Sequence, residues 1–575
     1  MLNRVRFSPR IRFSTKAVLG TLLVLFFATA LTLGYLWFYR SSFSCSGDFD
    51  LAIIGGEIID GLGGASFHAD LGIRNKHIAC VGTVDPARAG EVLDATGLTV
   101  APGFIDVHTH VERNVPTRSE AFVAPNFVRQ GVTTIITGNC GRSFLDIGKA
   151  FRHLERNGTQ VNVASFVGHN TIRQHVMSDN AGPPSVEQLS KMKKGVAAAM
   201  RDGALGLSTG LEYIPGTFAT TDEIVELAKV VKNTDGIYVS HIRNEGSHGL
   251  AAISEAISIG QRSGVHVHFS HFKAQGPNQW GRAEARLNLV KAGRDKGLMI
   301  SLDQYPYTAS STTIAVLLPS WVSSGGRASV RERLNNPATR AQVRTQMLEQ
   351  LREGGWKDYS FARVSYYGFD RSIVGLSIPE ISRLRDAAAP HRTEGKSIKA
   401  SFDSTSTGAR ESDLERQADS VMDLFSHGDA QMVFFNMSEG DVETIMANPE
   451  VMFGSDSGVR EESAEARPHP RGLGTFPRVL GVYGRGKHLF SIEEAVRRMT
   501  SLPAATFGVR ERGQIKEGYF ADLVVFDKNS IIDTATYESP LRSPVGIYYV
   551  LVNGSIVFNG RGFTKSFPGM VLPRR

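Results

Sequence analysis

The chain has 575 residues, which suits one large domain accompanied by a smaller one. Hydrophobic residues make up 41% and charged residues 21%, which excludes a largely disordered or collagen-like protein, and three cysteines are too few for a disulfide scaffold. The net charge is +7, but residues 1–40 hold six Lys or Arg and no acid, so the rest of the chain is nearly neutral. This distribution argues against a nucleic-acid binder.

Residues 17–39 form an uninterrupted run of uncharged, mostly apolar residues behind a basic tail at residues 1–16. At ~1.5 Å per helical residue the run is long enough for a ~30 Å hydrocarbon layer, so it predicts a transmembrane signal anchor with the lipid bilayer as a partner. The positive charges before it predict a single-pass membrane protein with a cytosolic amino terminus and the remaining chain on the extracytoplasmic or lumenal side. The alternative is a signal peptide cleaved within residues 41–46, which would make the protein secreted.

Short strand-like segments with turn residues between them occur near both ends of the remaining chain. Residues 50–60 read as a hairpin around Gly55-Gly56, and residues 521–527 and 547–557 have the same character. We predict one small β-sandwich domain built from both ends, residues 49–101 and 505–565.

Eight apolar runs alternate with helix-like segments between these ends. The runs are residues 104–107, 132–137, 161–167, 204–207, 237–240, 265–270, 298–302 and 451–454, with residues 431–435 as another candidate for the last. This α/β alternation predicts a (β/α)₈ barrel of the TIM type over residues 102–504. Residues 310–397 have a helical, charged pattern that departs from the alternation of strands and helices. They predict a lid-like insertion after the seventh strand.

Potential metal ligands stand where these runs end. They are His108 and His110 after the first run, Cys140 after the second, His241 after the fifth, His271 after the sixth and Asp456 after the eighth. Barrel enzymes place catalytic groups at the carboxyl ends of their strands, and alternate residues on a strand share a face. Imidazole, thiolate and carboxylate donors together suit Zn²⁺ best.

A metal ion with an open coordination position lowers the pKa of bound water to ~7 and polarises a carbonyl. Asp456 would then act as the base that takes the proton of the water and later returns it to the leaving nitrogen. No Gly-x-Ser-x-Gly follows a strand, so the sequence predicts hydrolysis without a covalent serine intermediate.

The chain resembles the D-aminoacylase (N-acyl-D-amino-acid deacylase) family of the amidohydrolase superfamily over roughly residues 49–565. The blocks that carry the resemblance are APGFIDVHTH at 101–110, GVTTIITGNCG at 131–141, SHFK at 270–273, DQYPY at 303–307 and HPRG at 469–472. The resemblance implies a tight zinc site made by Cys140, His241 and His271. It implies a weaker second metal site made by His108, His110 and Asp456.

The resemblance also implies that Lys273, Tyr305 and Arg471 bind the carboxylate or the scissile carbonyl of the substrate. Arg471 suits bidentate recognition of a carboxylate, and Tyr305 could donate a hydrogen bond to a developing oxyanion. Many binuclear relatives carry a carboxylated Lys on strand four, and residues 207–213 contain none. A bridging role would therefore fall to Cys140, with Glu212 as an outside candidate.

The implied activity is zinc-dependent hydrolysis of N-acyl-D-amino acids to a carboxylate and a free D-amino acid. One alternative is hydrolysis of cyclic amides or N-carbamoyl compounds. Another is a membrane-tethered binding protein without activity.

Overall fold

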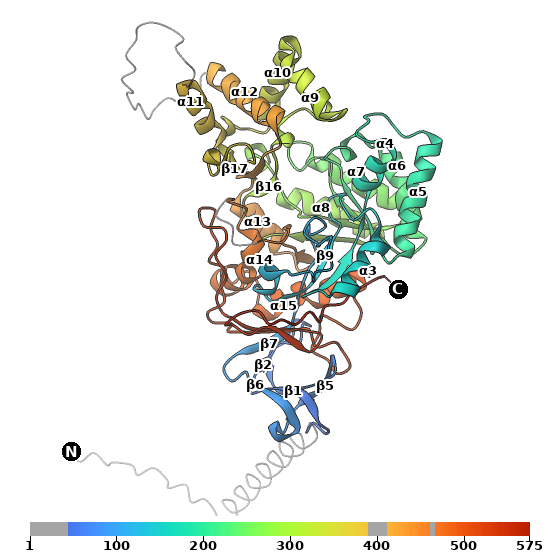
Figure 1. Ribbon diagram of the computed structural model, residues 1–575, viewed down its shortest axis with the longest axis vertical. Helices are drawn as coiled ribbons and strands as arrows, with labels where there is room; N and C mark the ends of the chain where they lie inside the picture. The colour runs from blue at the N-terminus through green and yellow to red at the C-terminus, as the bar shows by residue number, and fades with distance from the viewer. Residues whose placement is uncertain (1–43, 389–410, 461–465, 575) are drawn as a thin grey trace, which may run out of the picture.

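The computed structural model describes residues 44–388, 411–460 and 466–574. A β-rich domain lies at one end of the molecule, a barrel forms the middle, and an inserted helical segment lies at the opposite end (Figure 1).

All eight predicted apolar runs contain barrel strands. These are β8 (Phe104–Asp106), β9 (Val132–Thr137), β10 (Asn162–Ser165) continued by β11 (Val167–Gly168), β12 (Gly206–Gly210), β13 (Ile237–His241), β14 (His266–Phe269), β15 (Ile300–Gln304) and β19 (Val451–Phe453). Neighbouring strands pair in parallel. A parallel bridge between Thr109 and Ser457 joins the last strand to the first. The strands read as apolar runs because helices and the barrel interior bury both their faces.

Helices cover the outside of the barrel. They are α2 (Pro125–Val128), α3 (Ile147–Asn157), α4 (His169–Met177), α5 (Val186–Arg201), α6 (Thr221–Lys232), α7 (Gly249–Ser263), α8 (Ala283–Asp295), α13 (Glu439–Met446), α14 (Arg471–Arg478), the π-helical η8 (Val479–Gly486), α15 (Ile492–Met499) and α16 (Ser501–Phe507). Side chains cap several of them: Asp146 accepts from the Lys149 N–H in α3, and Ser185 and Gln188 form a capping box in α5. Such caps satisfy N–H groups that the first helical turn leaves without partners.

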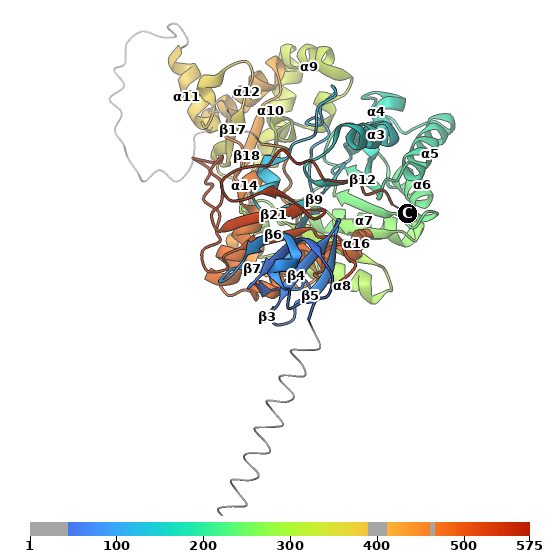
Figure 2. The same cartoon turned by 60° about the horizontal axis from the view of Figure 1, so that its bottom comes forward.

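Two sheets from opposite ends of the chain form the β-domain. One has the order β5-β4-β1-β6 and the other β22-β21-β20-β7-β2-β3. Their strands are β1 (Phe49–Ile54), β2 (Glu57–Ile58), β3 (Phe67–His68), β4 (Asp70–Arg74), β5 (His77–Gly82), β6 (Ala89–Asp94), β7 (Thr99–Pro102), β20 (Leu523–Phe526), β21 (Ile547–Val552) and β22 (Ser555–Phe558). β20 pairs antiparallel with β7, and in Figure 2 β21 lies beside the N-terminal strands. Leu71, Val100 and Leu523 belong to one buried cluster, so the two sheets share a core. The pairing of β20 with β7 supports a domain built from both ends of the chain, and the exact boundaries of that domain remain a prediction.

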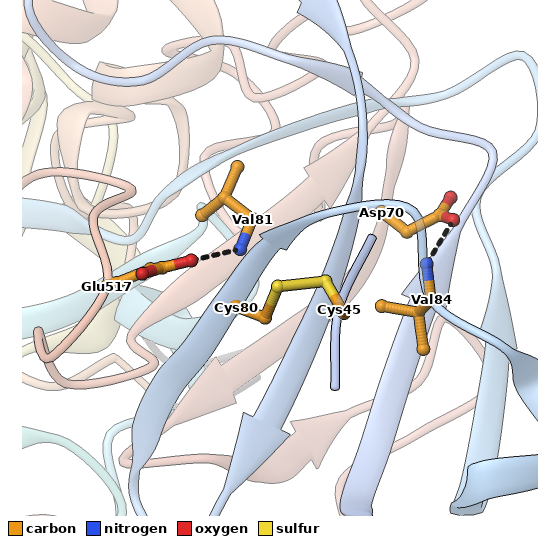
Figure 3. The surroundings of a disulfide bond; sticks show 6 residues. All are labelled: Cys45, Asp70, Cys80, Val81, Val84 and Glu517. Carbon is orange, nitrogen blue, oxygen red and sulfur yellow. Dashed lines mark hydrogen bonds between the residues drawn. A yellow bond between two sulfur atoms is a disulfide. The ribbon is translucent and has the colours of Figure 1, made fainter. Parts of the chain in front are cut away.

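A disulfide bond joins Cys45, which precedes β1, to Cys80 in β5 (Figure 3). The sequence, with only three cysteines, did not predict this bond. Hydrogen bonds hold the same region: Val84 donates its N–H to Asp70, and Val81 donates its N–H to Glu517 near the other end of the chain. The bond ties the first described residues to the β-domain.

The inserted segment follows β15 and has a sheet and a core of its own. It contains β16 (Ser310–Thr313), α9 (Gly326–Asn335), α10 (Pro337–Glu353), β17 (Ala362–Tyr366), α11 (Ile378–Ala388), α12 (Glu411–His427) and β18 (Gln431–Phe434). Its antiparallel sheet has the order β16-β18-β17, and side chains of α10 and α12 pack in one cluster. The candidate strand at 431–435 therefore belongs to this segment, because β19 takes the place beside β15.

The prediction of a transmembrane helix over residues 17–39 needs correction. Those residues lie outside the described part of the chain, and within the described part no helix is long and apolar enough to cross a membrane. The longest described helices, α10 and α12, have 17 residues each and carry charged side chains, whereas a span needs ~20 apolar residues. The described residues therefore give no support to the membrane helix in the fold class, or to the location and the bilayer partner inferred from it.

Replacing Cys45 and Cys80 with Ser is expected to lower the stability of the β-domain by about 2–4 kcal/mol. The disulfide joins residues 35 positions apart, and its loss lets the unfolded chain regain conformational entropy. Thermal unfolding should show a lower Tm for the double variant, and a reductant should lower the Tm of the wild type only. Equal Tm values for the oxidised wild type and the variant would contradict this prediction.

Candidate metal centre and active site

The structure brings the six predicted ligand residues together at the carboxyl end of the barrel. His108 and His110 follow β8, Cys140 follows β9, His241 ends β13, His271 follows β14 and Asp456 follows β19. Their ligand atoms form overlapping groups in which all atoms lie within 4.8 Å of one another. The parallel strands end at one edge of the barrel, which is why residues far apart in the sequence meet there.

Cys140, His241 and His271 form one of these groups. The Cys140 Sγ lies 3.7 Å from the His241 Nδ1 and 3.4 Å from the His271 Nε2, and the two nitrogens are 2.9 Å apart. All three side chains are buried. One sulfur and two imidazole nitrogens directed at a common point are a donor set that fits zinc.

His108, His110 and Asp456 lie beside that group. The Asp456 Oδ1 is 3.0 Å from the His110 Nε2 and 3.7 Å from the His108 Nε2. The Cys140 Sγ lies 3.3 Å from the His108 Nε2. The Cys140 sulfur thus lies close to imidazoles of both sets.

Three of these residues have a backbone conformation that L-residues rarely adopt. The φ angles of Cys140, His271 and Asp456 are 50°, 35° and 49°. A non-glycine residue in this region is strained by about 1–3 kcal/mol, and such residues cluster at functional sites. Each turns the chain sharply where its strand ends, which directs its side chain into the group.

Carboxylates lie near the outer nitrogens of three of the histidines. The Glu212 Oε2 lies 2.8 Å from the His241 Nε2, the Glu245 Oε1 lies 2.9 Å from the His271 Nδ1, and the Asp303 Oδ2 lies 3.5 Å from the His108 Nδ1. Such partners orient metal-binding imidazoles. Glu245 and Asp303 were not predicted as site residues from the sequence, and Glu212 was predicted only as a candidate bridging ligand. Asp303 lies in a quoted block, but nothing in the sequence distinguishes Glu245 from an ordinary loop acid.

The electrostatic environment favours ligand forms once a cation is present. Burial lowers the pKa of His271 to about 3, so its ring is neutral and can offer a lone pair. Burial raises the pKa of the Cys140 thiol well above its ordinary value, and the charges of Asp456 and Glu245 add to the effect. A metal cation reverses this because it favours the thiolate.

The three predicted substrate-binding residues lie next to the metal groups, and both cations are already ion-paired. The Lys273 Nζ is 2.6 Å from the Glu245 Oε1, and the Arg471 Nη1 is 2.8 Å from the Asp456 Oδ2. The Arg471 guanidinium lies over the Tyr305 ring, 4.7 Å from its centroid. Within the described part of the chain the Tyr305 hydroxyl has no hydrogen-bond partner, and burial raises its pKa well above the ordinary value, so it is a neutral donor.

A cavity of about 320 Å³ opens over this cluster. His241, His271, Lys273, Tyr305 and Asp456 form its barrel side, and residues of β16 and α10 form the opposite wall. The inserted segment therefore shapes the space in which a small molecule would meet His241, His271 and Asp456.

Three relatives show what the chain is similar to. The D-aminoacylase of Alcaligenes xylosoxydans xylosoxydans is 37% identical over 557 residues, covering 92% of this chain and 99% of that protein. A crystal structure of D-aminoacylase superposes with a TM-score of 0.75 at 32% identity, covering 92% of this chain and all of that one. The N-acyl-D-glutamate deacylase of Bordetella bronchiseptica, solved with zinc and a phosphonate mimic of the tetrahedral intermediate, has a TM-score of 0.74, 32% identity and the same coverage.

A family model described as "Amidohydrolase family" matches residues 91–558. The resemblance to the D-aminoacylases is confirmed by the full-length similarity to them. The same full-length similarity identifies the chain as an enzyme rather than the non-catalytic binding protein considered above. The chain therefore belongs to the amidohydrolase family.

Proposed function

We propose that the protein is a zinc-dependent deacylase that hydrolyses the amide bond of N-acyl-D-amino acids. The observation that carries the proposal is the convergence of Cys140, His241 and His271, with His241, His271 and Asp456 lining the cavity. The D-aminoacylase and N-acyl-D-glutamate deacylase relatives, the second of them solved with zinc, support the reaction, the stereochemistry and the metal.

In this proposal Cys140, His241 and His271 hold the tight zinc ion, and His108, His110 and Asp456 form a weaker second site. Zinc supplies Lewis-acid chemistry, since it lowers the pKa of water and polarises an amide carbonyl. The carboxylates behind His241 and His271 keep the rings in place, and Cys140 contacts both sets of ligands.

Asp456 is the general base and then the general acid. Burial raises its pKa, but the Arg471 cation and the hydrogen bond from His110 lower it by more, so the carboxyl is ionised and can accept a proton from water. A substrate carboxylate that binds Arg471 draws this cation away from Asp456. The pKa of Asp456 then rises towards the range in which it can also return the proton to the leaving nitrogen.

Lys273 and Arg471 bind the substrate carboxylate, and Tyr305 assists the reacting carbonyl. The neutral phenol of Tyr305 has no hydrogen-bond partner among the described residues, and its ring lies under the Arg471 guanidinium. A donor held in this way is ready to stabilise the oxyanion that forms as water attacks the amide.

The first test compares N-acetyl-D-methionine with N-acetyl-L-methionine. We expect release of the free amine from the D substrate only, because the proposal assigns the site to D-amino acids. Activity should disappear when a chelator removes the metal and return when zinc is added. Turnover of both enantiomers at the same rate, or full activity after metal removal, would contradict the proposal.

Asp456→Asn should lower kcat by about 10²–10⁴-fold, because the amide cannot take the proton of the attacking water. The tight zinc ligands are unchanged, so the variant should still contain zinc by metal analysis. If kcat stayed close to the wild-type value, Asp456 would not be the base.

Tyr305→Phe removes only the hydroxyl and should lower kcat by about 100-fold or more. Tyr307→Phe is a matched control, because Tyr307 bonds Asp533 away from the metal groups. Similar losses in the two variants would show that the Tyr305 hydroxyl has no special role.

A further inference from the structure

The cavity over the metal groups has a second set of polar residues, which no step proposed above brings into contact with the substrate. Glu212 follows β12 of the barrel, Glu353 is the last residue of α10, and Asn436 follows β18. All three line the cavity of about 320 Å³. Their chemistry bears on which substrate side chain the cavity accepts.

The lining of this cavity offers carboxylates without matching cations. Among the described residues that line it, Lys273 is the only Lys or Arg, and the substrate carboxylate is assigned to it above. Glu212 pairs with the imidazole of His241 at 2.8 Å, and Glu353 pairs with that of His248 at 3.0 Å. A substrate with an acidic side chain would therefore meet like charges in this cavity.

Glu353 is available to a bound molecule. Its side chain is 49% exposed and that of His248 is 70% exposed, and an ion pair open to solvent contributes little stability. The carboxyl end of α10 lies at the same place, since Gly354 also lines the cavity, and that end of a helix carries a partial negative charge. Both features favour a positive group next to Glu353.

Asn436 adds an acceptor that lacks a donor. The residue is 6% exposed, its Nδ2 donates to the Ser310 Oγ at 3.0 Å, and its Oδ1 has no hydrogen-bond partner within the described chain. Its backbone carbonyl accepts from the Gly276 N–H at 2.8 Å and from the Trp280 indole at 3.2 Å, which fixes its position. A buried acceptor without a donor is costly, so a donor on the bound molecule fits here.

The same cavity has an apolar and aromatic wall. Leu351, Trp356 and Phe361 belong to it, and the rings of Trp356 and Phe361 stack with their centroids 4.0 Å apart. The methylene stem of a Lys or Arg side chain packs well on such a surface, and aromatic faces attract cations. An apolar wall combined with carboxylates and a free acceptor suits a long side chain with a positive end.

We propose that the preferred substrates are N-acyl-D-amino acids with a basic side chain, such as D-lysine or D-arginine. Glu212, Glu353 and Asn436 are the specificity-determining residues, because they accept hydrogen bonds from the cationic end of that side chain. The inference rests on the proposed function and names its substrate class, with Lys273 and Arg471 binding the α-carboxylate as before.

The test compares kcat/KM of the wild-type protein for Nα-acetyl-D-lysine, N-acetyl-D-norleucine and N-acetyl-D-glutamate. Norleucine has the carbon chain of lysine without the ammonium, so the difference between the two reports on the charged end alone. We expect the lysine substrate to exceed the norleucine substrate by about 10- to 100-fold, and the glutamate substrate to fall below both. Equal values for lysine and norleucine, or a preference for glutamate, would overturn the inference.

Variants then locate the preference in the structure. Glu353→Lys should lower the ratio of lysine to norleucine turnover by at least about 10-fold and raise kcat/KM for the glutamate substrate. Glu349→Lys is the matched control, because Glu349 is an exposed residue of α10 that does not line the cavity, and it should keep the wild-type ratio. An equal effect of the two substitutions would show that the charge of α10 acts only at long range, against the proposed contact.

Asn436→Leu removes the free acceptor at similar size and should lower the ratio of lysine to norleucine turnover by about 10-fold. Because Asn436 is buried, the half-exposed Glu353 provides the test if this variant does not fold. A wild-type ratio in Glu353→Lys would overturn the inference.

Failure of the proposed function gives a different result. In that case the wild-type protein would release amine from none of the D substrates, including N-acetyl-D-methionine. Failure of this inference alone would leave the methionine and norleucine substrates hydrolysed, with no gain for the lysine substrate.

Discussion

Closure of the barrel between its last and first strands is the constraint on which the site depends. The N–H of Asp456 donates to the His108 carbonyl at 2.8 Å, and the N–H of His110 donates to the Ser457 carbonyl at 2.9 Å. These two backbone hydrogen bonds set the distance between the histidine pair and Asp456. His110 and Asp456 are 346 positions apart in the sequence. The remaining ligands follow from the parallel register, because each strand ends at the same edge.

Paired charges shape the space above that edge. Arg471 pairs with Asp456 and Lys273 pairs with Glu245, so each of these two anions has a cation beside it. A buried charge without a partner is strongly destabilising, so these pairs make a dense cluster of acids tolerable. They also mean that a substrate carboxylate must share or displace an existing partner, which links substrate binding to the proton-accepting group.

The barrel could be predicted because its signal is local. Residues 132–137 and 237–240 are short, apolar and followed by polar side chains, which is the pattern of parallel strands buried on both faces. Residues 431–435 carry the same local signal, but β18 pairs with β16 and β17 in the inserted segment. Pairing partners depend on the path of the chain, which composition does not reveal. The disulfide was missed for the same reason, since only the β-domain brings Cys45 and Cys80 to a Cα–Cα distance of 5.8 Å.

The sequence by itself determined the set of donors, because the type of each ligand and its place after an apolar run are properties of short segments. It also predicted the family through the blocks that hold those donors. Only the tertiary structure decided which groups stand behind the donors. Glu245 reaches Lys273 across 28 positions, and Asp456 pairs with Arg471, the first residue of α14. Such contacts depend on how whole loops pack against one another, and that packing is a property of the complete fold rather than of any segment.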